Sequence, residues 1–233
     1  VGAKLLIRED GTTLGTLGSP ELDQTALGPA REAMSFGRKN FLPAPGGSEI
    51  YIEAFASPPT IVVAGAGHMA LAIYKLAKFL GFRIAIVDDR PEFANRERFP
   101  EAEEIVAKDF VAGLRDVKIT SNTFIIVATR GHKYDDIALL EAARTPARYV
   151  GLVGSKRKAL LIYRTLLAEG IPIERVRDIH SPIGLNLGGR TPEEIALSIM
   201  AEIEMVRLGG DGAQMKMEEK LIQKARQKAG IPA

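Results

Sequence analysis

The sequence contains no cysteine, and this absence removes several kinds of chemistry from consideration. Disulfide bonds, cysteine-ligated zinc and a cysteine nucleophile are all excluded, because each of them needs a thiol. Whatever this chain binds or transforms must therefore be handled without a thiol.

An excess of charge of one sign is also missing. The 31 Lys and Arg residues face 29 Asp and Glu residues, which gives a formal net charge of +2. Proteins that bind polyanions usually carry a strong, clustered basic excess, so the balance argues against nucleic acid as a partner. Any basic patch must be local.

Long apolar runs are absent as well, because the longest ones are of strand length. Hydrophobic residues make up 46% of the chain and charged residues 26%, which is ordinary for a globular protein and predicts no membrane span. The N-terminus lacks the layout of a secretory signal, so we expect a cytoplasmic location. Because the chain starts at Val1 and not at methionine, we also expect residues to be missing upstream.

Two regions of different composition follow one another along the chain. Residues 1–58 are rich in Gly and Pro and are predicted to form a small β-rich domain, with β-segments over 4–8, 12–17 and 49–55. Two prolines, Pro58 and Pro59, then make a stiff joint. Residues 59–233 are predicted to form a second domain of the Rossmann type.

In this second region, apolar runs of strand length alternate with segments of helical period. This alternation is typical of a parallel sheet with crossover helices, so the predicted fold class is α/β, a doubly wound Rossmann-type sheet preceded by the small β-rich domain. We predict strands over 61–64, 83–87, 104–107, 123–128, 149–153 and 176–179, and helices over 68–80, 135–144, 156–169, 192–208 and 212–228.

A glycine-rich turn follows the first of these strands and opens a helix. It reads Gly65-Ala66-Gly67-His68-Met69-Ala70, and the next strand ends in Asp88-Asp89. In a dinucleotide fingerprint the first glycine permits the tight turn and the second lets the backbone approach a pyrophosphate, which meets the positive end of the helix. Asp88, or Asp89 one residue later, is placed to accept hydrogen bonds from a ribose diol. The nearby Arg90 could accommodate a 2′-phosphate, so the choice between NAD and NADP stays open.

Further polar residues follow other predicted strands. Ligands of open α/β sheets bind beyond the carboxyl ends of the strands, so these residues are site candidates. Besides the fingerprint they are His68, Arg130, His132, Ser155, Lys156, Arg157 and His180. Lys156 and Arg157 are interpreted either as a solvated helix edge or as part of an anion site, and the second is favoured because cations at the start of a helix oppose its macrodipole.

For His132 a backbone-bonded loop residue and a ligand-binding or acid–base residue are both open interpretations. The spacing of the three histidines provides no chelating pair, so no metal site is predicted. Asp135 and Asp136 are interpreted as the N-cap and a first-turn acid of the following helix.

These motifs, in this order, resemble the xanthine dehydrogenase accessory protein family (XdhC/CoxI), whose members help to mature molybdenum hydroxylases. The matching blocks are residues 2–4, 10–11, 15–18, 63–68, 87–93, 98–100, 129–135, 151–158, 180–185 and 191–196. The resemblance implies a small N-terminal domain and a Rossmann domain that together bind molybdenum cofactor, as molybdopterin or its cytosine dinucleotide. It further implies delivery to an apo-molybdenum hydroxylase, with a cysteine desulfurase as a further partner, and a homodimer.

The chain departs from this family pattern in one place. Where members often carry a triple glycine, a small or cysteine residue and a glutamate, this sequence reads Gly18-Ser19-Pro20-Glu21-Leu22. A relay of sulfur through a thiol of this chain is therefore impossible, and cofactor binding through this loop is in doubt.

Two other functions stay open beside that of a cofactor chaperone. The fingerprint suits an NAD(P)-dependent oxidoreductase with His132 as proton donor, and it equally suits a module that senses NAD(H). Against an enzyme, the chain has no recognisable substrate domain after the sheet and no acid–base set of distinctive spacing.

Overall fold

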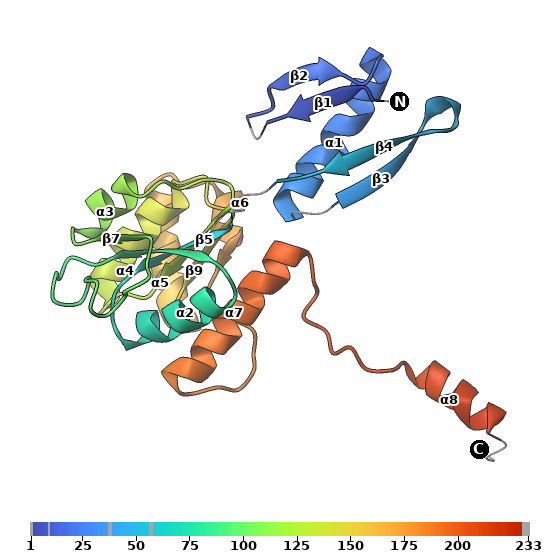
Figure 1. The fold of residues 1–233 in the computed structure, drawn as a ribbon. Helices are drawn as coiled ribbons and strands as arrows, with labels where there is room; N and C mark the ends of the chain where they lie inside the picture. Colours follow the sequence, from blue (N-terminus) through green and yellow to red (C-terminus); the bar gives the residue numbers. More distant parts are fainter. Residues whose placement is uncertain (1, 9, 37–38, 56–57, 230–233) are drawn as a thin grey trace.

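The computed structural model describes residues 2–8, 10–36, 39–55 and 58–229. A small N-terminal part packs beside a larger α/β part, and a C-terminal helix stands apart from both (Figure 1).

The N-terminal part consists of two antiparallel hairpins and one long helix. Strands β1 (Lys4–Ile7) and β2 (Thr13–Thr16) form the first hairpin, and β3 (Lys39–Ala44) and β4 (Ser48–Glu53) form the second, closed by the 3₁₀ turn Pro45–Gly47. Helix α1 (Pro20–Phe36) lies between them in sequence. The small core of this N-terminal part joins α1 to β4 through Ala26, Ala30, Ala33, Ile50 and Ile52.

Helix α1 was not predicted, because Gly28 and Pro29 interrupt its sequence and both are poor residues inside a helix. Packing outweighs them. The buried alanines at positions 26, 30 and 33 share one face of the helix and allow it to approach β4 closely. Proline at the first helical position, Pro20, also suits a helix start.

The larger part is built on a parallel sheet with the strand order β10-β9-β8-β5-β6-β7. Its strands are β5 (Thr60–Ala64), β6 (Arg83–Val87), β7 (Glu104–Val106), β8 (Thr123–Val127), β9 (Tyr149–Leu152) and β10 (Ile179–His180). This is the strand order of doubly wound dinucleotide-binding folds, and it reverses direction between β5 and β8. The predicted fold class is confirmed.

Helices cover both faces of this sheet, which is why its strands are apolar throughout. Helices α2 (His68–Phe79) and α7 (Pro192–Leu208) pack on the face of Ile61 and Val63. Helices α3 (Phe110–Asp116), α4 (His132–Ala143) and α5 (Lys156–Ala168) pack on the face of Val62 and Ala64. A capping box formed by Thr191 and Glu194 begins α7.

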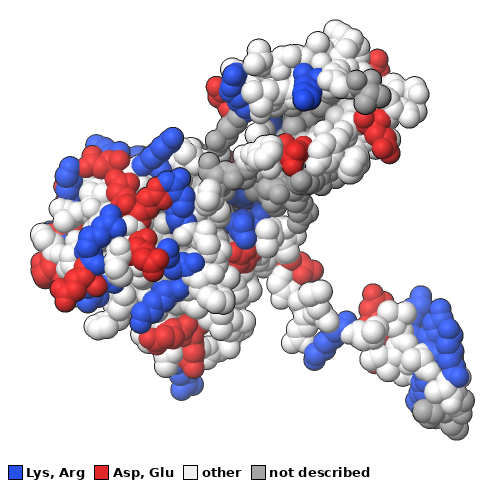
Figure 2. Space-filling model, in the orientation of Figure 1, with Lys and Arg blue, Asp and Glu red and all other residues white. Residues whose placement is uncertain are grey.

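Three predicted elements differ from the structure. The segment predicted as a strand over 176–179 is the short helix α6 (Ile173–Arg177), followed by the two-residue strand β10. Helix α4 starts at His132, three residues earlier than predicted. In the tail, among residues up to 229, only α8 (Glu219–Lys228) is helical; it has no buried residue, and basic side chains gather along it (Figure 2).

In the part of the chain that the structure describes, no helix is long and apolar enough to cross a membrane.

Candidate functional site at the carboxyl edge of the sheet

The fingerprint turn is held between the ends of two neighbouring strands. The Gly65 N–H donates to the Val87 carbonyl oxygen at the end of β6, at 2.7 Å. Gly65 has a φ of +124°, and a Cβ added there would lie 2.2 Å from the Ala128 carbonyl oxygen just beyond β8. Glycine is therefore required at this position both for its backbone conformation and for the close approach.

The second glycine opens onto free space. Gly67 is the N-cap of α2 with ordinary extended angles, φ −74° and ψ −164°, and a Cβ added there would meet no atom of the described residues within 4 Å. No described side chain caps this helix, and its first turn holds no acidic residue. The first N–H groups of α2 are thus available to an anion, which the helix dipole also favours.

The other predicted residues of the fingerprint support this turn. Ala66 is fully buried, Met69 packs against the core, and His68 is exposed at the start of α2.

Asp88 is buried, with 1% of its surface exposed, and its carboxylate accepts four hydrogen bonds. Oδ2 accepts from the Ala66 N–H at 2.8 Å and from Arg90 Nη2 at 2.9 Å. Oδ1 accepts from the Arg90 N–H at 3.1 Å and from Arg90 Nε at 2.8 Å. A ribose diol would have to displace one of these donors to bind Asp88.

Asp89, by contrast, is paired with Arg130 from the loop after β8. Arg130 Nη2 donates to Asp89 Oδ2 at 2.8 Å, and Nη1 donates to Oδ1. These hydrogen bonds hold the pKa of Asp89 below its ordinary value, although burial opposes the shift, and they raise the pKa of Arg130. The Arg130 guanidinium also lies 3.9 Å from the ring centre of Tyr134.

A third arginine reaches the fingerprint from a distant part of the chain. Arg98 Nη2 donates to the Ala66 carbonyl oxygen at 3.1 Å. It stands in the irregular segment after β6, where the Arg90 guanidinium lies 3.9 Å over the ring of Phe93. Sequence reasoning did not select Arg98, because the only signal was its place in the block 98–100.

The residues predicted after β9 separate into two groups. Ser155 is the N-cap of α5 and accepts a hydrogen bond from the Lys158 N–H at 3.3 Å, while Lys156 and Arg157 are exposed beside it. These two cations lie at the carboxyl edge, as predicted, with their side chains in solvent.

Lys158 turns inward and forms an ion pair with Asp135, whose side chain is 1% exposed. The Thr129 hydroxyl donates to the other Asp135 oxygen at 2.8 Å. The interpretation of Asp135 as an N-cap is wrong, because Gly131 occupies that position and Asp135 lies in the first turn of α4. The carboxylate fixes the loop after β8 to the start of α5.

Two histidines remain to be placed. His132 begins α4, but its side chain lies outside what the structure describes. His180 pairs with Gly151 inside the sheet and not beyond its edge, because the last strand is displaced from the predicted 176–179. On the α7 face, His180 Nδ1 lies 3.4 Å from Glu202 Oε1, and its ring stacks on Tyr149 at 4.4 Å.

Glu202 is a buried carboxylate with three donors around it. Burial by itself raises its pKa, but hydrogen bonds from His180, the Tyr149 hydroxyl and the Gly184 N–H outweigh burial and hold the pKa below its ordinary value. Burial and the neighbouring Glu202 raise the pKa of Tyr149. The network joins α7 to the sheet.

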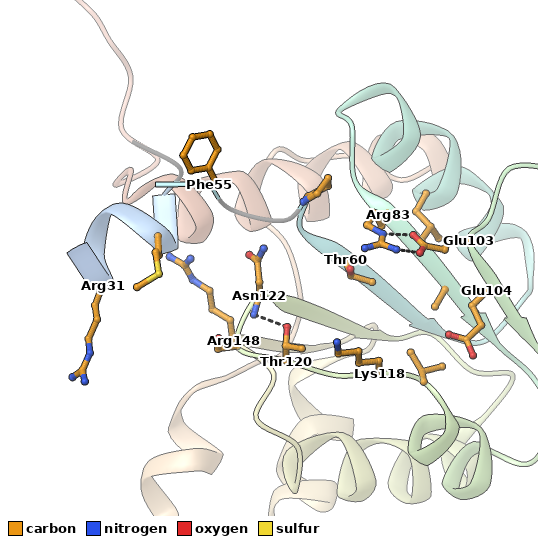
Figure 3. Close-up of a pocket in the computed structure, with 16 residues that line it drawn as sticks. Arg31, Phe55, Thr60, Arg83, Glu103, Glu104, Lys118, Thr120, Asn122 and Arg148 are labelled. Carbon is orange, nitrogen blue, oxygen red and sulfur yellow. Dashed lines mark hydrogen bonds and ion pairs between the residues drawn. The ribbon is translucent and has the colours of Figure 1, made fainter. Parts of the chain in front are cut away.

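A cavity of about 490 Å³ lies at the opposite, amino edge of the sheet, where α1 approaches it (Figure 3). Arg31, Phe55, Thr60, Arg83, Lys118 and Asn122 are among its lining residues. Arg83 forms an ion pair there with Glu103. This edge lies away from the strand ends at which α/β folds bind ligands.

No group of three or more His, Asp or Glu side chains among the described residues is arranged to hold a metal ion.

Comparison with known families gives two matches along the chain. Residues 61–203 match the model of the XdhC Rossmann domain, and residues 1–42 match that of the XdhC and CoxI family. The first match alone spans more than half of the chain. The chain belongs to the XdhC and CoxI family. The predicted resemblance is thereby confirmed.

The XdhC assignment agrees with two curated relatives. The uncharacterized protein YqeB of Escherichia coli is 32% identical over 228 residues, which cover 91% of this chain and 42% of YqeB. A probable xanthine dehydrogenase subunit of Bacillus subtilis is 27% identical over 160 residues, which cover 69% of this chain and 46% of that protein. The chain thus spans less than half the length of these relatives.

The XdhC fold is also found in a solved structure described as a xanthine dehydrogenase from Bacillus halodurans. It superimposes with a TM-score of 0.58 at 19% identity and covers 91% of this chain and 88% of its own. At that identity the likeness concerns the fold alone.

Proposed function

We propose that this chain is a maturation factor for molybdenum hydroxylases of the xanthine dehydrogenase type. It binds molybdenum cofactor, as molybdopterin or its cytosine dinucleotide, and passes it to the apoenzyme. Membership of the XdhC and CoxI family supports this proposal, as does a relative named after xanthine dehydrogenase.

The observation that carries the proposal is the open N-terminus of α2. The space beside Gly67 is free of atoms of the described residues, and the uncapped N–H groups of the helix face it. A pterin phosphate or the pyrophosphate of its dinucleotide form is strongly anionic, and such groups bind at helix N-termini. The donor set therefore fits the phosphate end of this cofactor.

Each part of the edge has its own task in this proposal. The backbone at Gly67 and His68 binds the phosphate, Asp88 and Arg98 keep the turn in position through Ala66, and Lys156 and Arg157 attract the anion from solution. When bound, the group would carry the molybdenum centre that the hydroxylase uses. This chain only binds and releases it.

Sulfur must come to the cofactor from outside these 233 residues, since they contain no cysteine. A cysteine desulfurase is the class of enzyme that supplies such sulfur. The proposed partners are therefore the apo-hydroxylase and a desulfurase.

The same strand order and glycine turn also suit NAD or NADP, so an oxidoreductase or an NAD(H) sensor is the second candidate. The saturated carboxylate of Asp88 weighs against it, because nicotinamide sites use an acidic side chain at this position to bind the ribose.

The test is equilibrium binding under anaerobic conditions to molybdopterin, its cytosine dinucleotide, NAD and NADP, followed by transfer from the loaded chain to an apo-hydroxylase. We expect preference for the pterin ligands and recovery of hydroxylase activity. Preference for a nicotinamide ligand would instead establish the sensor or oxidoreductase, and a substrate-dependent change in the nicotinamide absorbance would separate these two.

A further inference from the structure

The ion pair between Asp89 and Arg130 crosses the carboxyl end of the strand that carries the fingerprint. Asp89 follows β6 and Arg130 follows β8, and β5 lies between these two strands in the sheet. Strands two places apart in a sheet are separated by roughly 10 Å. The pair therefore bridges the crevice at the point where the strand order reverses, next to the turn that would hold a phosphate.

The guanidinium of Arg130 is held in position by two neighbours, Asp89 and Tyr134. Its two terminal nitrogens bind the Asp89 carboxylate end-on, and its guanidinium lies on the ring of Tyr134. A guanidinium presents the same pair of donors to a phosphate as to a carboxylate. Asp89 thus occupies the position that a phosphate oxygen pair would take.

The exposure of the pair makes this exchange feasible. The side chains of Arg130 and Asp89 are 31% and 27% exposed, and ion pairs with this access to water contribute little to stability. The neighbouring pair between Asp88 and Arg90 differs, since Asp88 is 1% exposed and also binds the fingerprint turn. Of these two pairs, only the outer one can open without disturbing the turn.

We propose that Asp89 is an internal competitor for the anionic ligand of this site, and that Arg130 changes partner from Asp89 to a ligand phosphate on binding. The proposal deepens the proposed function, since it concerns the same site. It assigns to Arg130 the contact with a phosphate or pyrophosphate group, and to Asp89 the selection against ligands that lack one.

The exchange is balanced in charge and protons. Two N–H donors of Arg130 leave the Asp89 carboxylate and bind two phosphate oxygens, and no proton moves. The released carboxylate returns to water, where it repels a second anion. Asp89 consequently weakens anion binding in two ways, by occupying Arg130 and by its own charge.

The experiment measures binding of inorganic pyrophosphate and ADP by calorimetry to the wild type and to Asp89→Asn and Arg130→Ala. We expect Asp89→Asn to bind pyrophosphate about fivefold to tenfold more tightly, because Arg130 loses its hydrogen-bonded carboxylate, keeping only Asp88 Oδ1 at 4.0 Å, and a negative charge is lost. We expect Arg130→Ala to bind it about tenfold more weakly, and the double variant to behave like Arg130→Ala.

Glu103→Gln is the matched control, because it removes the acidic partner of Arg83 in an ion pair at the opposite edge of the sheet. Glu103→Gln changes the net charge by the same amount as Asp89→Asn, and it should leave pyrophosphate binding unchanged. Thermal unfolding checks that each variant is folded, and Asp89→Ser replaces Asp89→Asn if that variant is not.

An Asp89 variant with unchanged or weaker binding would overturn the proposal, as would an Arg130→Ala variant with wild-type affinity or pyrophosphate that binds to none of the proteins. These failures differ from failure of the proposed function. If the variants respond as expected but the wild type does not bind the pterin ligands, the cofactor assignment is wrong and the exchange of partners by Arg130 is supported. If pterin ligands bind and the variants change nothing, the exchange alone is wrong.

Discussion

At the amino edge of the sheet polar side chains line a cavity, whereas at the carboxyl edge they bind one another around a glycine turn. The first edge has the space of about 490 Å³. At the carboxyl edge, hydrogen bonds of 2.8–3.1 Å fix the side chains of four residues, namely Asp88, Asp89, Arg98 and Arg130. Judged by hollow space alone, the amino edge would be chosen.

The direction of the helices favours the carboxyl edge as the binding site instead. Helices that follow parallel strands start at the carboxyl edge and end at the amino edge, so N–H groups face a ligand at one edge and carbonyl groups at the other. The open start of α2 lies at the carboxyl edge. At the far end of α7, Arg148 donates to the Val206 and Arg207 carbonyl oxygens, at 3.1 and 3.3 Å. By helix direction, an anion is favoured at the carboxyl edge.

The largest effect should come from Gly65→Ala, which tests whether the carboxyl edge depends on its tight turn. The new Cβ would lie 2.2 Å from the Ala128 carbonyl oxygen and would impose a strained backbone at φ +124°. Strain and overpacking of this kind each cost about 1–3 kcal/mol. We expect the melting temperature to fall by about 10 °C. A melting curve identical to that of the wild type would show that the turn can relax.

Gly67→Thr should weaken ligand binding strongly without harming the fold. The threonine side chain enters the open space, and its hydroxyl can accept from the first N–H groups of α2, as N-cap residues do. We expect an unchanged melting temperature and about 100-fold weaker binding of pyrophosphate-containing ligands, which corresponds to about 2.7 kcal/mol. Wild-type affinity in this variant would place the ligand away from α2.

These two glycines also show how much could be predicted from the sequence. The strand–turn–helix context identified the fingerprint and the parallel sheet, because both are local patterns with a fixed spacing. The partner of Asp89 was beyond reach, because Arg130 is 41 residues from Asp89 and the pairing depends on strand order. Arg98 was missed for the same reason, since it meets Ala66 across 32 residues.

The misplaced elements have a different cause. Helix α1 was missed because the local preferences of Gly28 and Pro29 were given more weight than the packing of its alanines on β4. The 176–179 strand was misassigned because a segment of four residues, two of them the charged Arg177 and Asp178, is too short to distinguish a strand from a helix by periodicity. That error moved His180 from inside the sheet to its edge.

Glu202→Gln tests whether the third polar cluster, on the α7 face, is structural. Glu202 Oε2 accepts from Tyr149 and Gly184 and Oε1 accepts from His180, so the NH2 group of a glutamine would turn a donor toward one of these donors. We expect a loss of about 1–2 kcal/mol near pH 7 with unchanged ligand affinity. Because the folded-state pKa of Glu202 is lowered, its contribution is present above its unfolded pKa of 4.5 and is lost as the pH falls through the folded value.

The difference in unfolding free energy between wild type and Glu202→Gln should therefore shrink below pH 4.5. Denaturant titrations at a neutral, a mildly acidic and a strongly acidic pH measure it. A variant that loses ligand binding at unchanged stability would make this cluster a part of the site and would end the contrast between the two edges.

The smallest effect is expected from the exposed cations, and it compares the two edges directly. Replacing Lys156 and Arg157 by alanine removes two positive charges at the carboxyl edge, and replacing Arg31 and Lys118 removes two that line the amino-edge cavity. Both double variants change the net charge equally, so a difference between them depends on position alone.

We expect the Lys156 and Arg157 double variant to weaken ligand binding about threefold to fivefold and to flatten its salt dependence, because exposed charges act through a screened field. The Arg31 and Lys118 double variant should match the wild type in both respects. Equal losses in the two variants would mean that only total charge matters, whereas a larger loss from Arg31 and Lys118 would place the ligand in the amino-edge cavity.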